Sequence, residues 1–272
     1  MTFTQIADQP QPSKDYLWLH LRELPYFRAL LRSVEARFYQ EIELHSPILD
    51  LGCGDGHFAS IAFDRRLDVG IDPWWDPLQE ARQRSAYREL MQSDGSWLPF
   101  PNGYFASAVS NSVLEHIPNL EPVLLEVARV LKAGAPFVFC VPNHRFDKML
   151  SVGKFFDSVG LDLFGNRYRA FFNRISRHYH CDPPELWESR LKVTGFQLER
   201  WWHYFSPAAL RMLEWGHYFG LPSLISKKLT HRWIISPSRW NLSFIYRMLK
   251  PYYNEPVCRD RGVYSFFIAT RL

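Results

Sequence analysis

The sequence lacks several features that would place it in specialised classes of protein. It has no apolar run of about eighteen residues, so it predicts no membrane-spanning helix. Its four cysteines are scattered, which argues against a disulfide framework and for a reducing compartment. Residues 1–20 lack the basic start and apolar stretch of a signal peptide, so we expect a cytoplasmic protein. A net charge of +4 does not by itself indicate nucleic-acid binding.

What the chain does contain is typical of one globular α/β unit, with 47% hydrophobic and 22% charged residues. Short apolar runs predict strands, and amphipathic segments between them predict helices, so the alternation favours a doubly wound parallel sheet. In the first predicted helix, which follows Pro25, we assign Arg28, Arg32, Glu35 and Arg37 to the faces away from the core. The strands are predicted at 47–51, 67–72, 90–92, 107–111, 136–141, 196–205 and 262–271, and the later helices at 57–63, from 76, at 119–132 and up to 195. We expect Asp76 to cap its helix and Asn119 to cap the helix after it.

The most informative motif is an apolar strand that ends in an acid and continues into a turn with three glycines. It reads Ile48-Leu49-Asp50-Leu51-Gly52-Cys53-Gly54-Asp55-Gly56. Glycines allow positive φ and close approach of a ligand to the backbone, and the following helix offers free amides. A second apolar run ends in Asp72, sixteen residues after Gly56, where a βαβ unit places the acid that binds ribose hydroxyls. The two motifs together predict a site for an adenosine-containing cofactor.

Further motifs make the chain resemble a known family, the class I S-adenosylmethionine-dependent methyltransferases with a type 11-like domain. The resemblance is strong over residues 47–144 and weaker after 184. It rests on the glycine turn, Asp72, Ser93-Asp94-Gly95, Leu98-Pro99-Phe100-Pro101, Ser110-Asn111-Ser112-Val113-Leu114-Glu115-His116-Ile117 and Ala128-Arg129-Val130-Leu131-Lys132-Ala133-Gly134-Ala135. One departure is Ala106, where many relatives carry an acid after the phenylalanine that precedes the fourth strand.

The resemblance implies S-adenosyl-L-methionine as cofactor and a Rossmann-like, seven-stranded, mostly parallel sheet. It also implies a single methyltransferase domain: an N-terminal helical cap (1–46), a cofactor-binding half (47–144), an acceptor-side segment (145–205), a basic aromatic helical insertion (206–261) and a last strand (262–272). The cofactor-binding residues that it implies are Asp50, Gly52, Cys53, Gly54, Gly56, Asp72, Pro73, Asp94, Gly95, Asn111 and Ser112.

The residues that act on the methyl acceptor are harder to predict, because methyl transfer needs alignment and exclusion of water more than acid–base groups. His116 and His144 follow the fourth and fifth strands and are the candidate catalytic residues. Residues 178–181, His-Tyr-His-Cys, have no second ligand pair at suitable spacing, so we expect no metal site. Tyr179 or His180 is instead expected to face the substrate. Other uses of these residues, such as a loop hydrogen bond for His144, stay open.

The insertion at 206–261 gives the best indication of the acceptor. It carries nine Lys or Arg and three acids, a net charge of +6, together with many aromatic residues. This composition suits a helical cap with a solvated basic face, or peripheral contact with an anionic membrane at its inner face. A small-molecule or lipophilic acceptor is expected, and nucleic acid is disfavoured because no RNA-binding motif accompanies the charge. The sequence gives no indication of oligomeric state.

Two other functions remain open at this point. A catalytically silent module could keep the same cofactor site. An NAD(P)-dependent oxidoreductase is disfavoured, because the glycine pattern is Gly-x-Gly-x-Gly and such an enzyme has no role for residues 111–117.

Overall fold

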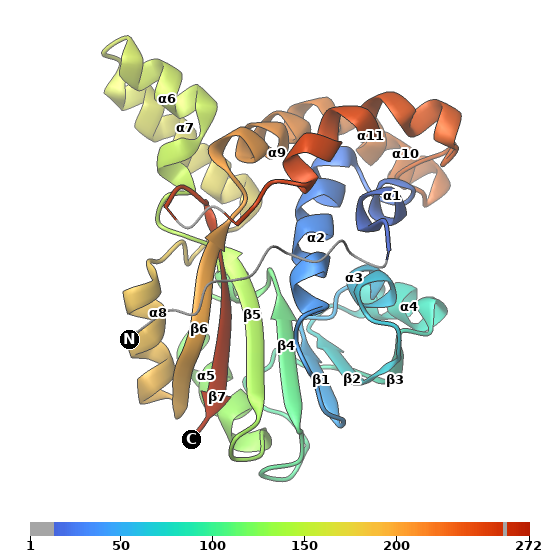
Figure 1. Cartoon of the computed structure of the whole chain (residues 1–272), viewed down its shortest axis with the longest axis vertical. Coiled ribbons are helices and arrows are strands. Elements are labelled where there is room, and N and C mark those ends of the chain that lie inside the picture. The colour runs from blue at the N-terminus through green and yellow to red at the C-terminus, as the bar shows by residue number, and fades with distance from the viewer. Residues whose placement is uncertain (1–13, 258–259) are drawn as a thin grey trace.

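The computed structural model describes residues 14–257 and 260–272, so Cys258 lies outside the described residues. Strands and helices alternate through the first half, and helices dominate the second (Figure 1). The strands are β1 (Ile48–Leu51), β2 (Leu67–Asp72), β3 (Tyr87–Gln92), β4 (Ser107–Asn111), β5 (Pro136–Pro142), β6 (Phe196–Tyr204) and β7 (Tyr264–Arg271). The helices are α1 (Tyr16–Leu21), α2 (Tyr26–Tyr39), α3 (His57–Ala62), α4 (Trp75–Arg84), α5 (Leu120–Val130), α6 (Ser151–Ser158), α7 (Asp162–Ser176), α8 (Pro184–Val193), α9 (Pro207–Phe219), α10 (Leu221–Thr230) and α11 (Arg239–Tyr253), with 3₁₀ turns η1 (Leu114–His116) and η2 (Asp147–Met149).

The strands form one seven-stranded sheet in the order β3-β2-β1-β4-β5-β7-β6. All neighbouring strands run parallel except β7, which is antiparallel to both β5 and β6. The strand order reverses between β1 and β4, and in open α/β sheets a ligand crevice lies at the carboxyl ends of the strands at such a point. The predicted fold class is therefore confirmed.

Both faces of the sheet are covered, which explains why the central strands are apolar throughout. Every residue of β1 and β4 is buried. One hydrophobic cluster joins Leu49 of β1 to Val127 of α5 and Trp187 of α8. The other joins Ile48 to Leu30 of α2 and Leu210 of α9. The N-terminal helical cap thus shares one core with the sheet.

The later helices gather at one end of the sheet. Figure 1 shows α9, α10 and α11 at the end toward which β4 and β5 point, with α6 and α7 forming a hairpin that projects beyond them. Residues 144–181 show no clear helical periodicity, so no helix was predicted there, yet η2, α6 and α7 form in this segment. Their exposed faces carry apolar residues such as Phe155 and Leu163, which blur the polar–apolar period.

Three local predictions need correction. The third strand begins at Tyr87 rather than Leu90, because Tyr87 pairs with Leu67 of β2. The helix predicted from Asp76 begins at Trp75, and its N-cap residue Trp74 makes no side-chain cap. Asn119 stands at the N-cap of α5, but its side chain makes no cap hydrogen bond.

Among the described residues, no helix combines the length and apolar character needed to cross a bilayer. Of the cysteines within the described residues, Cys53, Cys140 and Cys181 are free thiols.

Candidate active site

The glycine-rich turn between β1 and α3 is fastened to β2 by backbone and side-chain hydrogen bonds. The amides of Gly52 and Cys53 each donate to the Ile71 carbonyl at 2.8 Å. The Asp72 carboxylate accepts from the amides of Gly54 at 2.9 Å and Trp74 at 3.0 Å. Asp72 therefore holds the turn in place, and its contact with a ribose stays a prediction.

All three glycines of the turn adopt positive φ, and the surroundings of Gly52 and Gly54 differ. Gly52 has φ +77°, and a Cβ there would lie 2.3 Å from Val113 Cγ1, so only glycine fits against the loop after β4. Gly54 has φ +54°, and a Cβ there would meet no atom within 4 Å. Gly54 therefore faces open space beside the backbone, which is the room that a ligand needs to approach the turn closely.

That open space belongs to a cavity of about 460 Å³, the first cavity, at the carboxyl ends of β1 and β4. It brings together seven of the predicted site residues: Asp50, Gly52, Cys53, Gly54, Asn111, Ser112 and His116. The helical cap and the insertion also contribute to its lining, among other residues through Arg28, Lys227 and Trp233. Lys227 of α10 forms an ion pair with Glu80 of α4 at 2.8 Å, which ties the insertion to the cofactor-binding half.

The other predicted cofactor residues do not line this cavity. They are Gly56, Asp72, Pro73, Asp94 and Gly95. Asp94 is exposed and accepts hydrogen bonds from the Ser96 amide at 2.9 Å and the Ser96 hydroxyl at 2.7 Å. A Cβ on Gly56 would lie 3.2 Å from Ala81, so this glycine allows α3 and α4 to pack. The roles predicted for these five residues toward the cofactor stay predictions.

Asp50 is a buried acid at the floor of the first cavity. Burial raises the pKa of its carboxyl to about 7, although the Tyr87 hydroxyl, which donates to it at 2.6 Å, acts in the opposite direction. The carboxyl is therefore poised to ionise near neutral pH. A cation that entered this corner would favour the ionised form.

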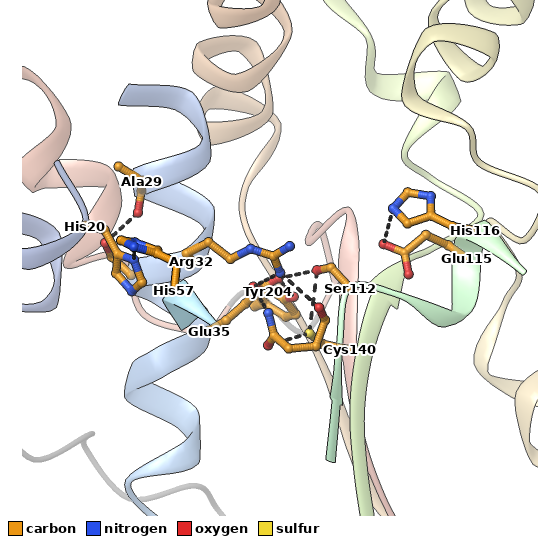
Figure 2. Close-up of polar contacts among 12 residues, drawn as sticks. His20, Ala29, Arg32, Glu35, His57, Ser112, Glu115, His116, Cys140 and Tyr204 are labelled. Atoms are coloured by element: carbon orange, nitrogen blue, oxygen red, sulfur yellow. Dashed lines mark hydrogen bonds and ion pairs between the residues drawn. The ribbon is translucent and has the colours of Figure 1, made fainter. Parts of the chain in front are cut away.

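A buried polar network joins α2 to the carboxyl end of β4 (Figure 2). The Glu35 carboxylate accepts from the side chains of Arg32 at 3.0 Å, Asn111 at 2.7 Å, Ser112 at 2.9 Å and Tyr204 at 2.9 Å. Arg32 also donates to the Asn111 carbonyl at 3.1 Å. The network fixes the loop that follows β4 and holds the helical cap over the cavity.

This network was not predicted from the sequence. Arg32 and Glu35 were expected on outward faces of the helix, but Glu35 is fully buried and Arg32 lines the cavity. The position of Glu35 on an otherwise apolar helix face could have indicated the network. A glutamate is rarely buried unless its carboxylate has partners. Those partners lie on β4 and β6, which only the tertiary structure brings to α2.

A second cavity, of about 240 Å³, adjoins the first. Arg28, Arg32, Ser112 and His116 line both, so the two cavities are neighbours along one wall. The rest of its lining combines apolar and polar side chains, namely Phe27, Leu31, Phe146, Ile175, Leu213 and Tyr264 with Glu115, Ser176, His178 and His217. Such a mixture is typical of a small-molecule site, in which a few polar groups orient an apolar ligand.

Three titratable side chains of the second cavity lie together. His116 Nε2 is 3.8 Å from Glu115 Oε1, and the His116 and His178 rings stack at 5.5 Å between centroids (Figure 2 shows the first pair). Burial raises the pKa of Glu115 to about 8 and lowers the pKa of His178 to about 3. Burial also lowers the pKa of His116. At neutral pH this wall of the cavity therefore carries neutral imidazoles.

The other histidines that the sequence analysis singled out lie elsewhere. His144 lines neither cavity, and its ring faces His203 at 6.2 Å. His180 bonds to the Ile117 carbonyl at 3.0 Å, and Tyr179 is exposed. The residue of this segment in the cavity wall is their neighbour His178.

The sheet order, the glycine turn and the crevice at the β1–β4 reversal give this chain the Rossmann-like fold that class I methyltransferases have. Residues 49–139 match the family model described as a methyltransferase domain. The geranyl diphosphate C-methyltransferase of Streptomyces coelicolor shares the fold, with a TM-score of 0.54, 14% identity and coverage of 98% of this chain and 88% of that one. A [4+2]-cyclase shares it too, with a TM-score of 0.53, 17% identity and coverage of 89% of this chain and 81% of that one.

Curated relatives match over the same part of the chain. A fatty-acid O-methyltransferase of Mycolicibacterium smegmatis is 36% identical over 106 residues, which are 37% of this chain and 38% of that protein. A malonyl-[acyl-carrier protein] O-methyltransferase of Legionella pneumophila is 31% identical over 98 residues, 34% of each chain. The matches thus span under two fifths of these relatives.

Proposed function

We propose that this chain transfers a methyl group from S-adenosylmethionine to a small lipophilic acceptor held in the second cavity. The observation that carries the proposal is the adjacency of the two cavities, with the glycine turn in one and an apolar, polar-edged space in the other. The cofactor, when bound, supplies a methyl group already activated by its positive sulfur. What is left to the protein is alignment of the acceptor and exclusion of water.

The residues of the first cavity fit the charges of that cofactor. Its ammonium needs acceptors, and Asp50 supplies a carboxylate at the end of β1. Its carboxylate needs a cation, and Arg28 lines the same cavity, with its guanidinium over the Trp233 ring at 5.7 Å. Within residues 14–257 and 260–272, Arg28 forms no ion pair with a carboxylate. Its charge is therefore free for a ligand in either cavity.

Two features support a lipophilic acceptor. The second cavity is lined by side chains such as Leu31, Phe146 and Ile175. Two relatives that match this part of the chain are named as a fatty-acid O-methyltransferase and a malonyl-[acyl-carrier protein] O-methyltransferase. We therefore propose an acyl or similarly apolar molecule that carries an oxygen acceptor.

Incubation with methyl-labelled S-adenosylmethionine and an array of fatty acids, other apolar acids and cell lipid extracts tests this proposal. Label is expected in an organic-soluble product. If the protein binds the cofactor but labels none of these while it labels a polar metabolite, the lipophilic acceptor is wrong. Cofactor binding with no transfer to any extract would favour the catalytically silent alternative.

Cofactor affinity is expected to depend on pH through Asp50. Its carboxyl ionises near pH 7, and the ionised form attracts the cofactor ammonium, so binding should tighten as pH rises from 6 to 8. For a group with a pKa of about 7 that becomes ionised in the complex, the gain is about tenfold. Titration calorimetry at pH 6, 7 and 8 measures it, and Asp50→Asn serves as the control with a flat profile. An equal pH dependence in Asp50→Asn would assign the effect to another group.

We also propose peripheral contact with an anionic membrane through the insertion. Trp240 and Phe244 lie one turn apart on α11 and are 90% and 76% exposed, and Leu229 of α10 is 77% exposed. The basic residues of α10 are Lys227 and Lys228. Apolar side chains beside cations suit the interface of an anionic bilayer. Figure 1 shows α10 and α11 at the same end of the molecule as the α6–α7 hairpin.

The double substitution Trp240→Ala/Phe244→Ala is expected to weaken binding to phosphatidylserine-containing vesicles by about tenfold or more, since two large apolar side chains no longer enter the interface. Added salt should weaken binding of the unsubstituted protein. Sedimentation with vesicles measures both effects. Val193→Ala, an exposed site before β6 at the opposite end of the sheet, is the matched control. Absence of binding at low salt would remove the proposal.

A further inference from the structure

Glu115 and His116 of η1 meet His178, which lies far away in the sequence, in the lining of the second cavity. One ligand-type atom of each side chain lies within 4.8 Å of the corresponding atoms of the other two. Glu115 Oε1 and His116 Nε2 are 3.8 Å apart. A carboxylate with two imidazoles is the donor set of several catalytic zinc sites.

Hydrogen bonds outside the group hold its members in place. His116 Nδ1 lies 3.0 Å from the Arg177 carbonyl, a distance at which Nδ1–H donates and the Nε2 lone pair is left for a ligand. This is the outer contact that metal-bound histidines commonly make. The Tyr179 amide donates to the Glu115 carbonyl at 2.8 Å. Both bonds link the segment that carries His178 to the turn that carries Glu115 and His116.

The side chains of Glu115 and His178 each have a polar atom that accepts or donates no hydrogen bond among the described residues. Glu115 Oε2 and His178 Nδ1 are buried atoms without a hydrogen-bond partner among the described residues. Glu115 as a whole is only 1% exposed. Buried polar atoms normally have partners, because leaving one unpaired costs free energy. A bound cation would satisfy the carboxylate of Glu115 and a ring nitrogen of His178 together.

We propose that Glu115, His116 and His178 bind one divalent transition-metal ion, with Zn²⁺ as the best match to this donor set. Three protein ligands leave a coordination position open toward the second cavity. If the proposed function holds, an acceptor oxygen would occupy that position and be oriented there. The assignment makes His116 a metal ligand rather than a general base.

The surrounding charges permit a cation at this place. Arg32 is a cation of the same cavity, but it is paired with Glu35 at 3.0 Å. Arg28 and His217 also line the cavity, and burial lowers the pKa of His217, which favours its neutral form. On binding a cation the Glu115 carboxyl would lose its proton and offset one of the two charges of the ion.

Equilibrium dialysis of the untagged full chain against Zn²⁺, together with the absorption spectrum of the Co²⁺-loaded protein, tests the site. We expect one equivalent of metal and visible Co²⁺ bands typical of four or five ligands. His178→Ala and Glu115→Gln should each weaken binding by about 100-fold or more, since even outer partners of a metal site are worth 10–100-fold. His45→Ala, at an exposed histidine before β1, should bind as the unsubstituted chain does.

Circular dichroism and thermal unfolding show whether each variant is folded, and Glu115→Gln keeps the size of the side chain if His178→Ala does not fold. No stoichiometric metal on the folded chain would overturn the proposal. So would unchanged affinity in both folded variants. Dialysis reads metal binding directly, so a failure to find methyl transfer to any acceptor would leave its result standing.

Discussion

Glu35→Ala is expected to lower the free energy of unfolding by about 3–5 kcal/mol, the usual cost of breaking a buried, hydrogen-bonded charge pair. The substitution removes the acceptor of four hydrogen bonds and leaves the guanidinium of Arg32 without its carboxylate. It also removes the hydrogen bonds that the Asn111 and Ser112 side chains donate to α2, so cofactor affinity should fall with stability. Urea unfolding followed by circular dichroism measures the change.

Glu41→Ala is the matched control, because Glu41 is an exposed glutamate just beyond the end of α2. A substitution at such a position usually changes stability by less than about 0.5 kcal/mol. If Glu35→Ala and Glu41→Ala have the same stability, the network does not hold the helical cap to the sheet.

Gly52→Ala is expected to be the more damaging of two alanine substitutions in the glycine turn. Its Cβ would lie 2.3 Å from Val113 Cγ1, so either the turn or the loop after β4 must move. Gly54→Ala adds the same methyl group at a similar positive φ but meets no protein atom within 4 Å. We therefore expect Gly54→Ala to remain folded at a cost of about 1–2 kcal/mol, from the left-handed backbone alone.

The two variants separate folding from binding. In Gly54→Ala the added methyl group occupies space that the cofactor needs, so affinity should fall by about 10- to 100-fold while the fold persists. In Gly52→Ala both stability and binding should be lost. Thermal unfolding and cofactor titration on the same samples measure this. A Gly54→Ala protein that binds the cofactor normally would show that the ligand does not approach the turn at this point.

The fold could be predicted from the sequence over residues 47–144, because the local sequence patterns there agree with the tertiary structure. Asp50, Gly52 and Gly54 form one continuous motif, and β1 is apolar because both its faces are covered. The predicted sheet and the first cavity follow from such signals. The cap expected of Asp76 was wrong, because α4 begins earlier and Trp74 is the N-cap residue.

The acceptor side could not be predicted in the same way, because its residues meet only in the folded chain. The hydrogen-bond partners of Glu35 lie at the end of β4 and on β6. His178 lies close to Glu115, although the α6–α7 hairpin separates the two residues in the sequence. The hairpin itself was missed because exposed apolar residues such as Phe155 and Leu163 obscure helical periodicity. Tyr179 and His180 were predicted to face the substrate, but His178 lines the second cavity. The sequence does not show which of several adjacent polar side chains points into a cavity, because the backbone conformation determines that direction.

Titration calorimetry of the folded protein with S-adenosylmethionine, its demethylated product and NAD tests the central claim most directly. The first two ligands are expected to bind at one site per chain, with the first cavity as that site, and NAD is expected not to bind. Binding of NAD alone, or no binding of S-adenosylmethionine to a protein shown to be folded, would contradict the assignment of this chain as a methyltransferase.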